Sequence, residues 1–273
     1  MVLNLKRRQF LITASLSTVL TIGMATACTT TSPEVEGAAP TEESKVLVMA
    51  TSADYPPYEF YDTAAGTGEP IGFDIDLAKA LTEKLGYTLE IEDMDFGGII
   101  PALQAERVDF AMSGMTPTEE RKQSVDFSRI YYDAQNTIVS QKDSGFTSYD
   151  TLAGKTVGVQ LGSIQEGEAK EKAETIEGMA IEPRNKISEL IQEIKAGRLD
   201  AAIIEDTVAK GYIQNNPDLE FATIASDGES GSAIAFPKGS PLTEEFDQAL
   251  GELIESGELD AMVTTWFEDF YNK

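Results

Sequence analysis

Short apolar runs alternate with amphipathic stretches along the chain from residue 45 onward. Residues 46–51, 155–160 and 201–204 form short runs rich in β-branched or apolar side chains, which predict strands. Stretches with apolar residues at helical spacing lie at 72–85, 99–105, 187–196, 208–214, 242–255 and 259–271, and further short strands are expected at 87–91, 108–112 and 233–236. This alternation predicts an α/β fold in which parallel sheets carry helices on both faces.

One predicted strand runs directly into a helix start with strong local signals. The strand ends at Ser113 and Gly114, and Thr116 follows as the expected N-cap. Pro117 would occupy the first helical position, and Glu119 lies three residues after the cap, as in a capping box. Because a helix N-terminus offers unpaired N–H groups and a partial positive charge, this segment is suited to binding a small anion.

Arg121 lies about one turn further along the same predicted helix. A guanidinium group can bind a carboxylate through two parallel hydrogen bonds, so the segment is interpreted as a carboxylate clamp. The alternative is a well-capped surface helix in which Arg121 pairs with Glu119 or Asp126.

A second segment repeats the same arrangement. The predicted strand that ends at Gln160 is followed by Gly162, and Ser163 and Glu166 then form the pattern of a capping box. Two such units in separate parts of the chain favour two lobes that present helix N-termini to one ligand.

Composition excludes several chemistries. The 273-residue chain is long enough for two modest domains, contains no histidine and has Cys28 as its only cysteine. This excludes a nucleophile that is activated by histidine, and it excludes internal disulfides. It also excludes metal sites built on imidazole groups or on paired thiolates, and neither a cofactor nor a metal is expected. The net charge of −26 argues against nucleic acid as a partner.

Residues 1–27 are interpreted as an export signal rather than as part of the fold. The basic residues at 6–8 precede an apolar run at 11–24 and small residues at 25–27. The paired arginines resemble a twin-arginine signal, and the tripeptide before Cys28 resembles a lipobox, so lipidation of Cys28 is expected. The alternative is ordinary secretion with an incidental cysteine. Residues 28–44 lack apolar periodicity and are predicted to form a flexible tether.

Five motifs follow one another in an order that resembles a known family. They read SADYPPYEF at 52–60, GFDIDLA at 72–78, FGGIIPAL at 96–103, SGMTPTEER at 113–121 and VDFS at 125–128. Together with the exported N-terminus, they resemble the extracytoplasmic solute-binding proteins of polar amino-acid ABC transporters. The resemblance covers about residues 45–273 and implies a two-lobed periplasmic-binding-protein fold of type II, in which each lobe is a mixed, mostly parallel sheet flanked by helices. Lobe 1 would comprise 45–133 and 231–273, and lobe 2 would comprise 134–230.

The resemblance also implies roles for individual residues. Arg121 would bind the ligand carboxylate, Tyr55 and Phe96 would enclose the ligand side chain, and Glu205 would hold the α-ammonium group, although the adjacent Asp206 is an alternative. The remaining expected ligand-binding positions are Ser52, Ser113, Gly114, Thr116, Gln160, Ser163, Ile164 and Gln165. Four other acids, namely Glu59, Asp62, Asp74 and Asp76, are expected at the surface or at a helix start.

The expected function is to bind a polar L-amino acid, with a basic amino acid preferred and glutamine next, and to deliver it to an ABC transporter permease. The protein is expected to act as a monomer that a lipid anchors to the outer face of the cytoplasmic membrane or in the periplasm. Two alternatives remain, a ligand-binding sensor component and a dehydratase that uses Glu205 as a proton donor.

Overall fold

The computed structural model describes residues 44–62, 66, 68–225 and 230–272. These belong to one compact unit, which spans Glu43–Lys273. The predicted export signal, Cys28 and the predicted tether up to residue 43 lie outside the described residues. No helix within the described ranges is both long and apolar enough to cross a membrane.

One five-stranded sheet is built from the two ends of this unit, and it is called lobe 1 together with its helices. Its strand order is β5-β1-β6-β13-β7, with β1 Val46–Thr51, β5 Thr88–Asp93, β6 Phe110–Ala111, β7 Val125–Tyr132 and β13 Ser232–Pro237. Its helices are α1 Phe73–Leu85, α2 Phe96–Gln104, α3 Glu119–Lys122, α7 Leu242–Ser256 and α8 Glu258–Val263. A small sheet of β2 Asp54–Tyr55, β3 Glu59–Tyr61 and β4 Pro70–Ile71 lies between β1 and α1 in the sequence.

A second five-stranded sheet, called lobe 2 with its helices, is built from the middle of the chain. Its order is β10-β9-β11-β8-β12, with β8 Asn136–Gln141, β9 Thr156–Gln160, β10 Ala180–Arg184, β11 Ala201–Glu205 and β12 Leu219–Thr223. Its helices are α4 Ile164–Ala173, α5 Ile187–Lys195 and α6 Asp206–Gln214.

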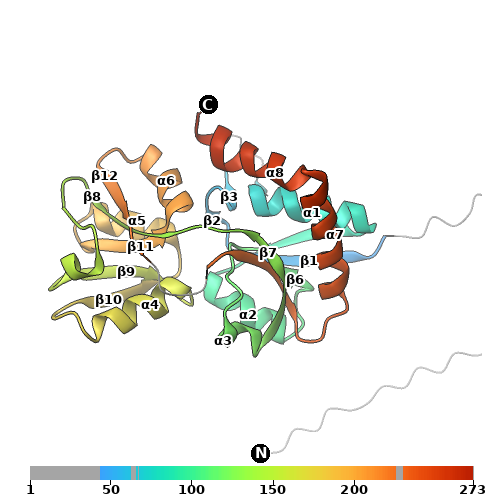
Figure 1. Cartoon of the computed structure of the whole chain (residues 1–273), viewed down its shortest axis with the longest axis horizontal. Helices are drawn as coiled ribbons and strands as arrows, with labels where there is room; N and C mark the ends of the chain where they lie inside the picture. Colours follow the sequence, from blue (N-terminus) through green and yellow to red (C-terminus); the bar gives the residue numbers. More distant parts are fainter. Residues whose placement is uncertain (1–43, 63–65, 67, 226–229, 273) are drawn as a thin grey trace, which may run out of the picture. The chain divides into compact units, whose positions relative to one another are not determined.

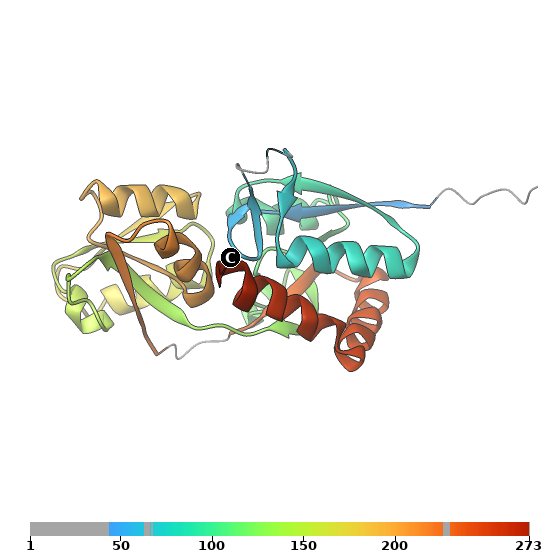
Figure 2. The same ribbon diagram turned by 90° about the horizontal axis from the view of Figure 1, so that it is seen from above.

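The chain passes twice between the two sheets (Figure 1). The first passage joins β7 to β8, and the second leads from β12 to β13 (Figure 2). In each sheet three strands pair in parallel, whereas the crossing strands pair antiparallel with their neighbours. The sheets are therefore mixed and mostly parallel, as the resemblance to the family implies, because a strand that crosses between lobes enters each sheet in the opposite direction.

The amphipathic helices form where the sequence predicts them. Gly72 precedes α1, and Gly86 ends it with a left-handed backbone (φ +77°), a conformation that glycine adopts without a steric penalty. The apolar face of α1, which includes Phe73, Leu77 and Leu81, is fully buried. Burial of each such side chain stabilises the fold by about 1.5–3 kcal/mol.

Several predicted boundaries are wrong. Thr118, not Thr116, is the N-cap of α3, and its hydroxyl accepts a hydrogen bond from the N–H of Arg121. The predicted helix at 259–271 is α8 followed by a wider π-helical turn, Thr264–Asp269. The predicted helix at 99–105 begins earlier, at Phe96.

Two of the acids expected at the surface or a helix start are in fact completely buried. Glu59 and Asp74 are both 0% exposed, and they lie close enough for the Asp74 carboxylate to raise the pKa of Glu59. Asp74 Oδ2 also accepts hydrogen bonds from Tyr131 Oη and from the N–H of Gly114, each at 2.9 Å. Asp74 therefore fixes the position of Gly114, in the segment between β6 and α3. Local sequence carries no signal for this burial, since the partners lie far apart in the chain.

Candidate functional site

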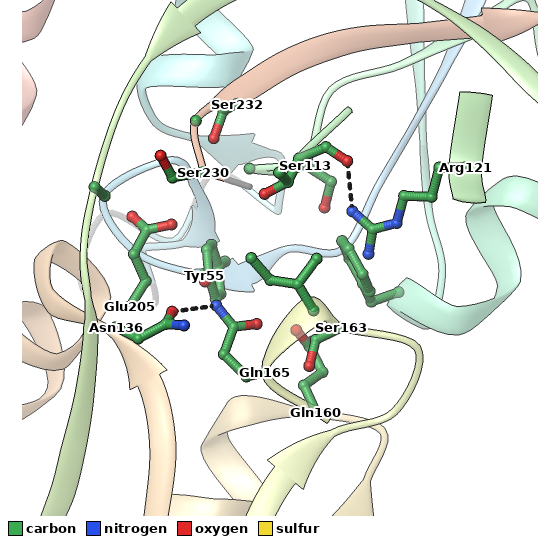
Figure 3. A pocket seen from close by; sticks show the side chains of 16 residues that line it. Tyr55, Ser113, Arg121, Asn136, Gln160, Ser163, Gln165, Glu205, Ser230 and Ser232 are labelled. Atoms are coloured by element: carbon green, nitrogen blue, oxygen red, sulfur yellow. Dashed lines mark hydrogen bonds between the residues drawn. The ribbon is translucent and has the colours of Figure 1, made fainter. Parts of the chain in front are cut away.

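A cavity lies between the elements of the two lobes (Figure 3). The residues that line it come from both lobes and from both crossing segments: Tyr55, Phe96, Ser113, Gly114, Thr116, Arg121, Ala134, Asn136, Gln160, Ser163, Ile164, Gln165, Glu205, Ser230, Gly231 and Ser232.

Arg121 supplies a buried cation on one side of the cavity. Its guanidinium donates to the carbonyl oxygens of Thr116 and Gly162, each at 2.9 Å, and lies 5.4 Å from the centre of the Phe96 ring. Burial lowers the pKa of Arg121 to about 10, although the nearby carboxylate of Glu120 opposes this shift. Arg121 is therefore still positively charged at neutral pH.

The alternative in which Arg121 pairs with a neighbouring acid is wrong. Glu119 pairs with Lys122 at 2.8 Å, and Asp126 pairs with Lys238 at 2.7 Å. Within the part of the chain that the structure describes, no carboxylate lies at ion-pair distance from Arg121. A buried cation without a carboxylate partner is costly, so an anionic ligand group would be stabilised there.

The turn from Ser113 to Thr116 lies next to this arginine. Gly114 has a left-handed backbone with φ +53°, and a Cβ atom at this position would lie 3.0 Å from Cε1 of Tyr55. Only glycine permits both this turn and the close packing of the Tyr55 ring. The Ser113 hydroxyl donates to Glu59 Oε1 at 2.7 Å, which fixes its orientation at the cavity wall.

Helix α4 directs its N-terminus at the cavity from lobe 2. Ser163 is the N-cap, and its Oγ accepts from the N–H of Glu166 at 3.1 Å. Glu166 Oε2 in turn accepts from the N–H of Gly162 at 2.6 Å, one residue earlier than in a standard capping box. The N–H groups of Ile164 and Gln165 belong to the first helical turn and have no intrahelical acceptor. These two N–H groups are therefore suited to an anion.

Glu205 supplies a carboxylate on the side of the cavity opposite Arg121 (Figure 3). It ends β11, is 8% exposed, and accepts a hydrogen bond from Thr207 Oγ1. Burial raises the pKa of Glu205 to about 7, although the Thr207 hydrogen bond opposes this shift. Asp206 does not line the cavity and instead accepts from the N–H of Gln135.

Aromatic rings and amides form the remaining wall. Tyr55 and Phe96 are each 8% exposed. Gln165 Nε2 donates to Asn136 Oδ1 at 2.9 Å (Figure 3). Gln160 Nε2 donates to the carbonyl oxygen of Asn185 at 3.3 Å. These amides retain polar atoms that could bind a ligand side chain.

The structure brings together all the predicted ligand-binding positions except Ser52. Ser52 is 1% exposed and lies behind the wall, where its N–H donates to Ser113 Oγ at 3.1 Å. Sequence reasoning missed five lining residues from the crossing segments: Ala134, Asn136, Ser230, Gly231 and Ser232. The local sequence at these positions shows no pattern that distinguishes them from an ordinary linker or strand start.

The cavity thus combines a cation, a carboxylate, a helix N-terminus and two aromatic rings. No group of acidic, histidine or cysteine side chains in the described ranges could hold a metal ion. The geometry is suited to enclosing a small zwitterion.

Comparison with known proteins gives consistent matches over the described unit. The model for bacterial extracellular solute-binding proteins, family 3, matches residues 47–269. The arginine-binding extracellular protein ArtP of Bacillus subtilis (strain 168) is 54% identical over 226 residues, which cover 82% of this chain and 86% of the relative.

Two solved structures are also similar. The substrate-binding protein of an amino acid ABC transporter has a TM-score of 0.77 and 45% identity, covering 82% of this chain and 99% of the other. An ancestral arginine-binding protein bound to glutamine has a TM-score of 0.76 and 39% identity, covering 83% of this chain and 99% of the other.

Proposed function

Because the chain belongs to the family 3 bacterial extracellular solute-binding proteins, we propose that its cavity binds an L-amino acid with a cationic side chain, L-arginine above all. The observation that carries this proposal is the placement of Arg121 and Glu205 on opposite sides of one cavity. A zwitterion requires a cation at one end and a carboxylate at the other, and each hydrogen bond to a charged group contributes about 1.5–3 kcal/mol.

In this proposal the ligand carboxylate lies between Arg121, Thr116 and the N-terminus of α4, while Glu205 holds the α-ammonium group. The ligand side chain extends along Tyr55 and Phe96. A guanidinium that stacks on an aromatic ring gains about 0.5–2 kcal/mol, which favours arginine. The arginine-binding relative supports the same choice.

Glutamine is the second candidate ligand. The amide side chains of Asn136, Gln160 and Gln165 could pair with a ligand amide, and a similar structure holds glutamine. Moreover, Glu205 is the sole carboxylate among the lining residues that the structure describes, so a cationic ligand side chain would have no second acid in the cavity wall.

Calorimetric titration of the purified chain with each of the twenty amino acids tests the proposal. Tightest binding of L-arginine is the expected result. A preference of tenfold or more for glutamine or another neutral amino acid would contradict the arginine assignment but leave amino-acid binding intact. Turnover of a cyclic carboxylic acid by the chain would instead favour the dehydratase alternative.

We further propose that the chain delivers its ligand to an ABC transporter permease from a lipid anchor at Cys28, acting as a monomer. The similar substrate-binding protein of an amino acid ABC transporter supports the delivery step. Loss of labelled-arginine uptake in cells that lack this protein, with recovery when it is restored, is the expected outcome.

A further inference from the structure

A second set of contacts joins the two lobes outside the ligand cavity. Lobe 1 contributes three carboxylates, from Asp54, Asp93 and Asp95, and lobe 2 contributes Asn185, Lys186 and the first N–H groups of α5. This set is called the clasp. None of its residues lines the cavity.

The centre of the clasp is a helix cap supplied by the other lobe. The N-cap residue of α5 is Lys186, which provides no capping hydrogen bond from its side chain, and lysine is not among the preferred N-cap residues. Asp54 takes over this role, because its Oδ2 accepts from the N–H of Ile187 at 2.5 Å and from the N–H of Ser188 at 3.4 Å. A carboxylate at a helix N-terminus is also favoured by the helix dipole.

Lys186 carries the opposite charge into the acidic side of lobe 1. Its Nζ lies 3.6 Å from Asp93 Oδ1, 3.9 Å from Asp95 Oδ1 and 4.0 Å from Asp54 Oδ1. The side chains of Lys186, Asp54 and Asp93 are 26%, 12% and 31% exposed, so these charges are partly shielded from water, whereas that of Asp95 is 52% exposed. Ion pairs in such positions are screened less than those at an open surface.

Two further contacts fix the same side of the junction. Asn185 Nδ2 donates to Asp95 Oδ2 at 2.8 Å, and Tyr212 Oη in α6 donates to the carbonyl oxygen of Asp54 at 2.7 Å. The carbonyl oxygen of Asn185 also accepts from Gln160, which does line the cavity. The clasp is therefore one contact away from the ligand site.

We propose that the clasp is a positioning device that sets ligand affinity by stabilising the closed arrangement of the lobes, with Asp54 as its central residue. When the lobes separate, α5 loses its cap and Lys186 loses its three carboxylates. The apparent affinity of a ligand falls in proportion to the fraction of molecules in the binding-competent state, so loss of the clasp weakens binding without touching the ligand. The affinity part of this inference rests on the proposed function.

The test compares Asp54→Ala, which removes the cap, with Asp54→Asn, which retains a capping oxygen but removes the charge. Asp126→Ala is the matched control, since Asp126 also accepts from a backbone N–H, that of Gly239, and pairs with a lysine, but entirely within lobe 1. Lobe separation is measured in the full chain by pulsed electron paramagnetic resonance, with nitroxides on cysteines at Glu83 and Glu171, two exposed helix positions, and with Cys28→Ser to prevent a third label.

Asp54→Ala is expected to reduce the short-distance population, and to weaken L-arginine binding about tenfold through faster dissociation. Asp54→Asn should show a smaller change, and Asp126→Ala none. If the distance distributions of Asp54→Ala and Asp54→Asn superimpose on that of the parent chain, the proposal is wrong. If the parent chain does not bind arginine, the proposed ligand is wrong, while the distance measurement still decides the role of the clasp.

Discussion

Arg121 Nη2 donates a 2.9 Å hydrogen bond to the carbonyl oxygen of Gly162, which belongs to the other lobe. The same guanidinium bonds to Thr116 within its own lobe. One side chain therefore takes part both in the expected recognition of the ligand carboxylate and in the contact between lobes. Replacement of this arginine should affect ligand binding and closure together.

Arg121→Ala should weaken amino-acid binding about thirtyfold or more, because the ligand carboxylate would lose a buried, hydrogen-bonded cation, a loss of about 2–5 kcal/mol. Calorimetry measures the affinity, and thermal unfolding checks that the variant is folded. Arg129→Ala is the control, since Arg129 is a half-exposed arginine that pairs with Asp247 away from the cavity. An affinity for Arg121→Ala within about threefold of the parent would refute the carboxylate clamp.

Ligand affinity should fall as the pH drops below 7, because the pKa of Glu205 is raised to about 7. Only the carboxylate form holds the ligand ammonium group, so protonation competes with binding. For a group with this pKa, the dissociation constant should be about tenfold higher at pH 6 than at pH 8.

Glu205→Gln provides the control for this pH profile. Its affinity should be low at every pH and should not vary between pH 6 and pH 8. An equally steep profile in Glu205→Gln would assign the titration to another group, such as Asp74, whose pKa burial raises to about 6.

Local signals in the sequence predicted the parts of the cavity wall around Arg121 and Ser163, whereas the other predicted lining positions came from the resemblance to the family. Gly114, Ser163 and the helix starts around them lie in short capping patterns, and a pattern of this kind depends only on neighbouring residues. The motifs of the resembling family then indicated how two distant segments meet at one ligand. The assignment of Thr116 as N-cap failed because Thr118 satisfies the same rule two residues later.

Contacts between distant segments could not be predicted in this way. Asp54 and Ile187 are separated by 133 positions in the sequence, yet one caps the helix of the other. The burial of Glu59 likewise depends on Asp74 and on Ser113, which lie on different elements. An acid in a turn-rich segment has no local feature that distinguishes a surface position from a buried pair.

The free energy of unfolding of Glu59→Gln should increase relative to that of the parent as the pH rises. Burial and the neighbouring Asp74 raise the pKa of Glu59 well above its ordinary value. The folded state therefore binds more protons than the unfolded state, so the contribution of Glu59 to stability is fully present below about pH 4.5 and is lost as the pH rises.

Glutamine at this position can still accept from Ser113 and donate to Asp74, but it does not titrate. Between pH 5 and pH 7 the difference in free energy of unfolding between Glu59→Gln and the parent should therefore grow with pH, by no more than about 1.4 kcal/mol per pH unit. Urea unfolding at each pH measures it. A difference that stays constant over this range would contradict a protonated Glu59 in the folded chain.

Tyr55→Leu should weaken L-arginine binding more than L-glutamine binding. The tyrosine ring offers a cation–π contact worth about 0.5–2 kcal/mol to a guanidinium, and a neutral amide gains less. Titration of both amino acids into the variant gives the ratio of the two losses. Tyr55→Phe is the matched control, since it retains the ring and should bind arginine nearly as the parent does. Equal losses for both ligands in Tyr55→Leu would show that the ring acts only by shape.

Cys28→Ala should release the protein from the membrane fraction into the soluble extracytoplasmic fraction, with its ligand preference unchanged. The reason lies in the sequence: the only cysteine of the chain directly follows three small residues at the end of an apolar run, where a lipid would be attached. Fractionation of cells that express each form, followed by immunoblotting, measures the distribution. Ser32→Ala, a similar change four residues further along, should remain with the membrane. If Cys28→Ala is still found in the membrane fraction, N-terminal sequencing separates two explanations: an intact leader means that the uncleaved apolar segment holds the protein there, whereas a cleaved one means that Cys28 is not the anchor.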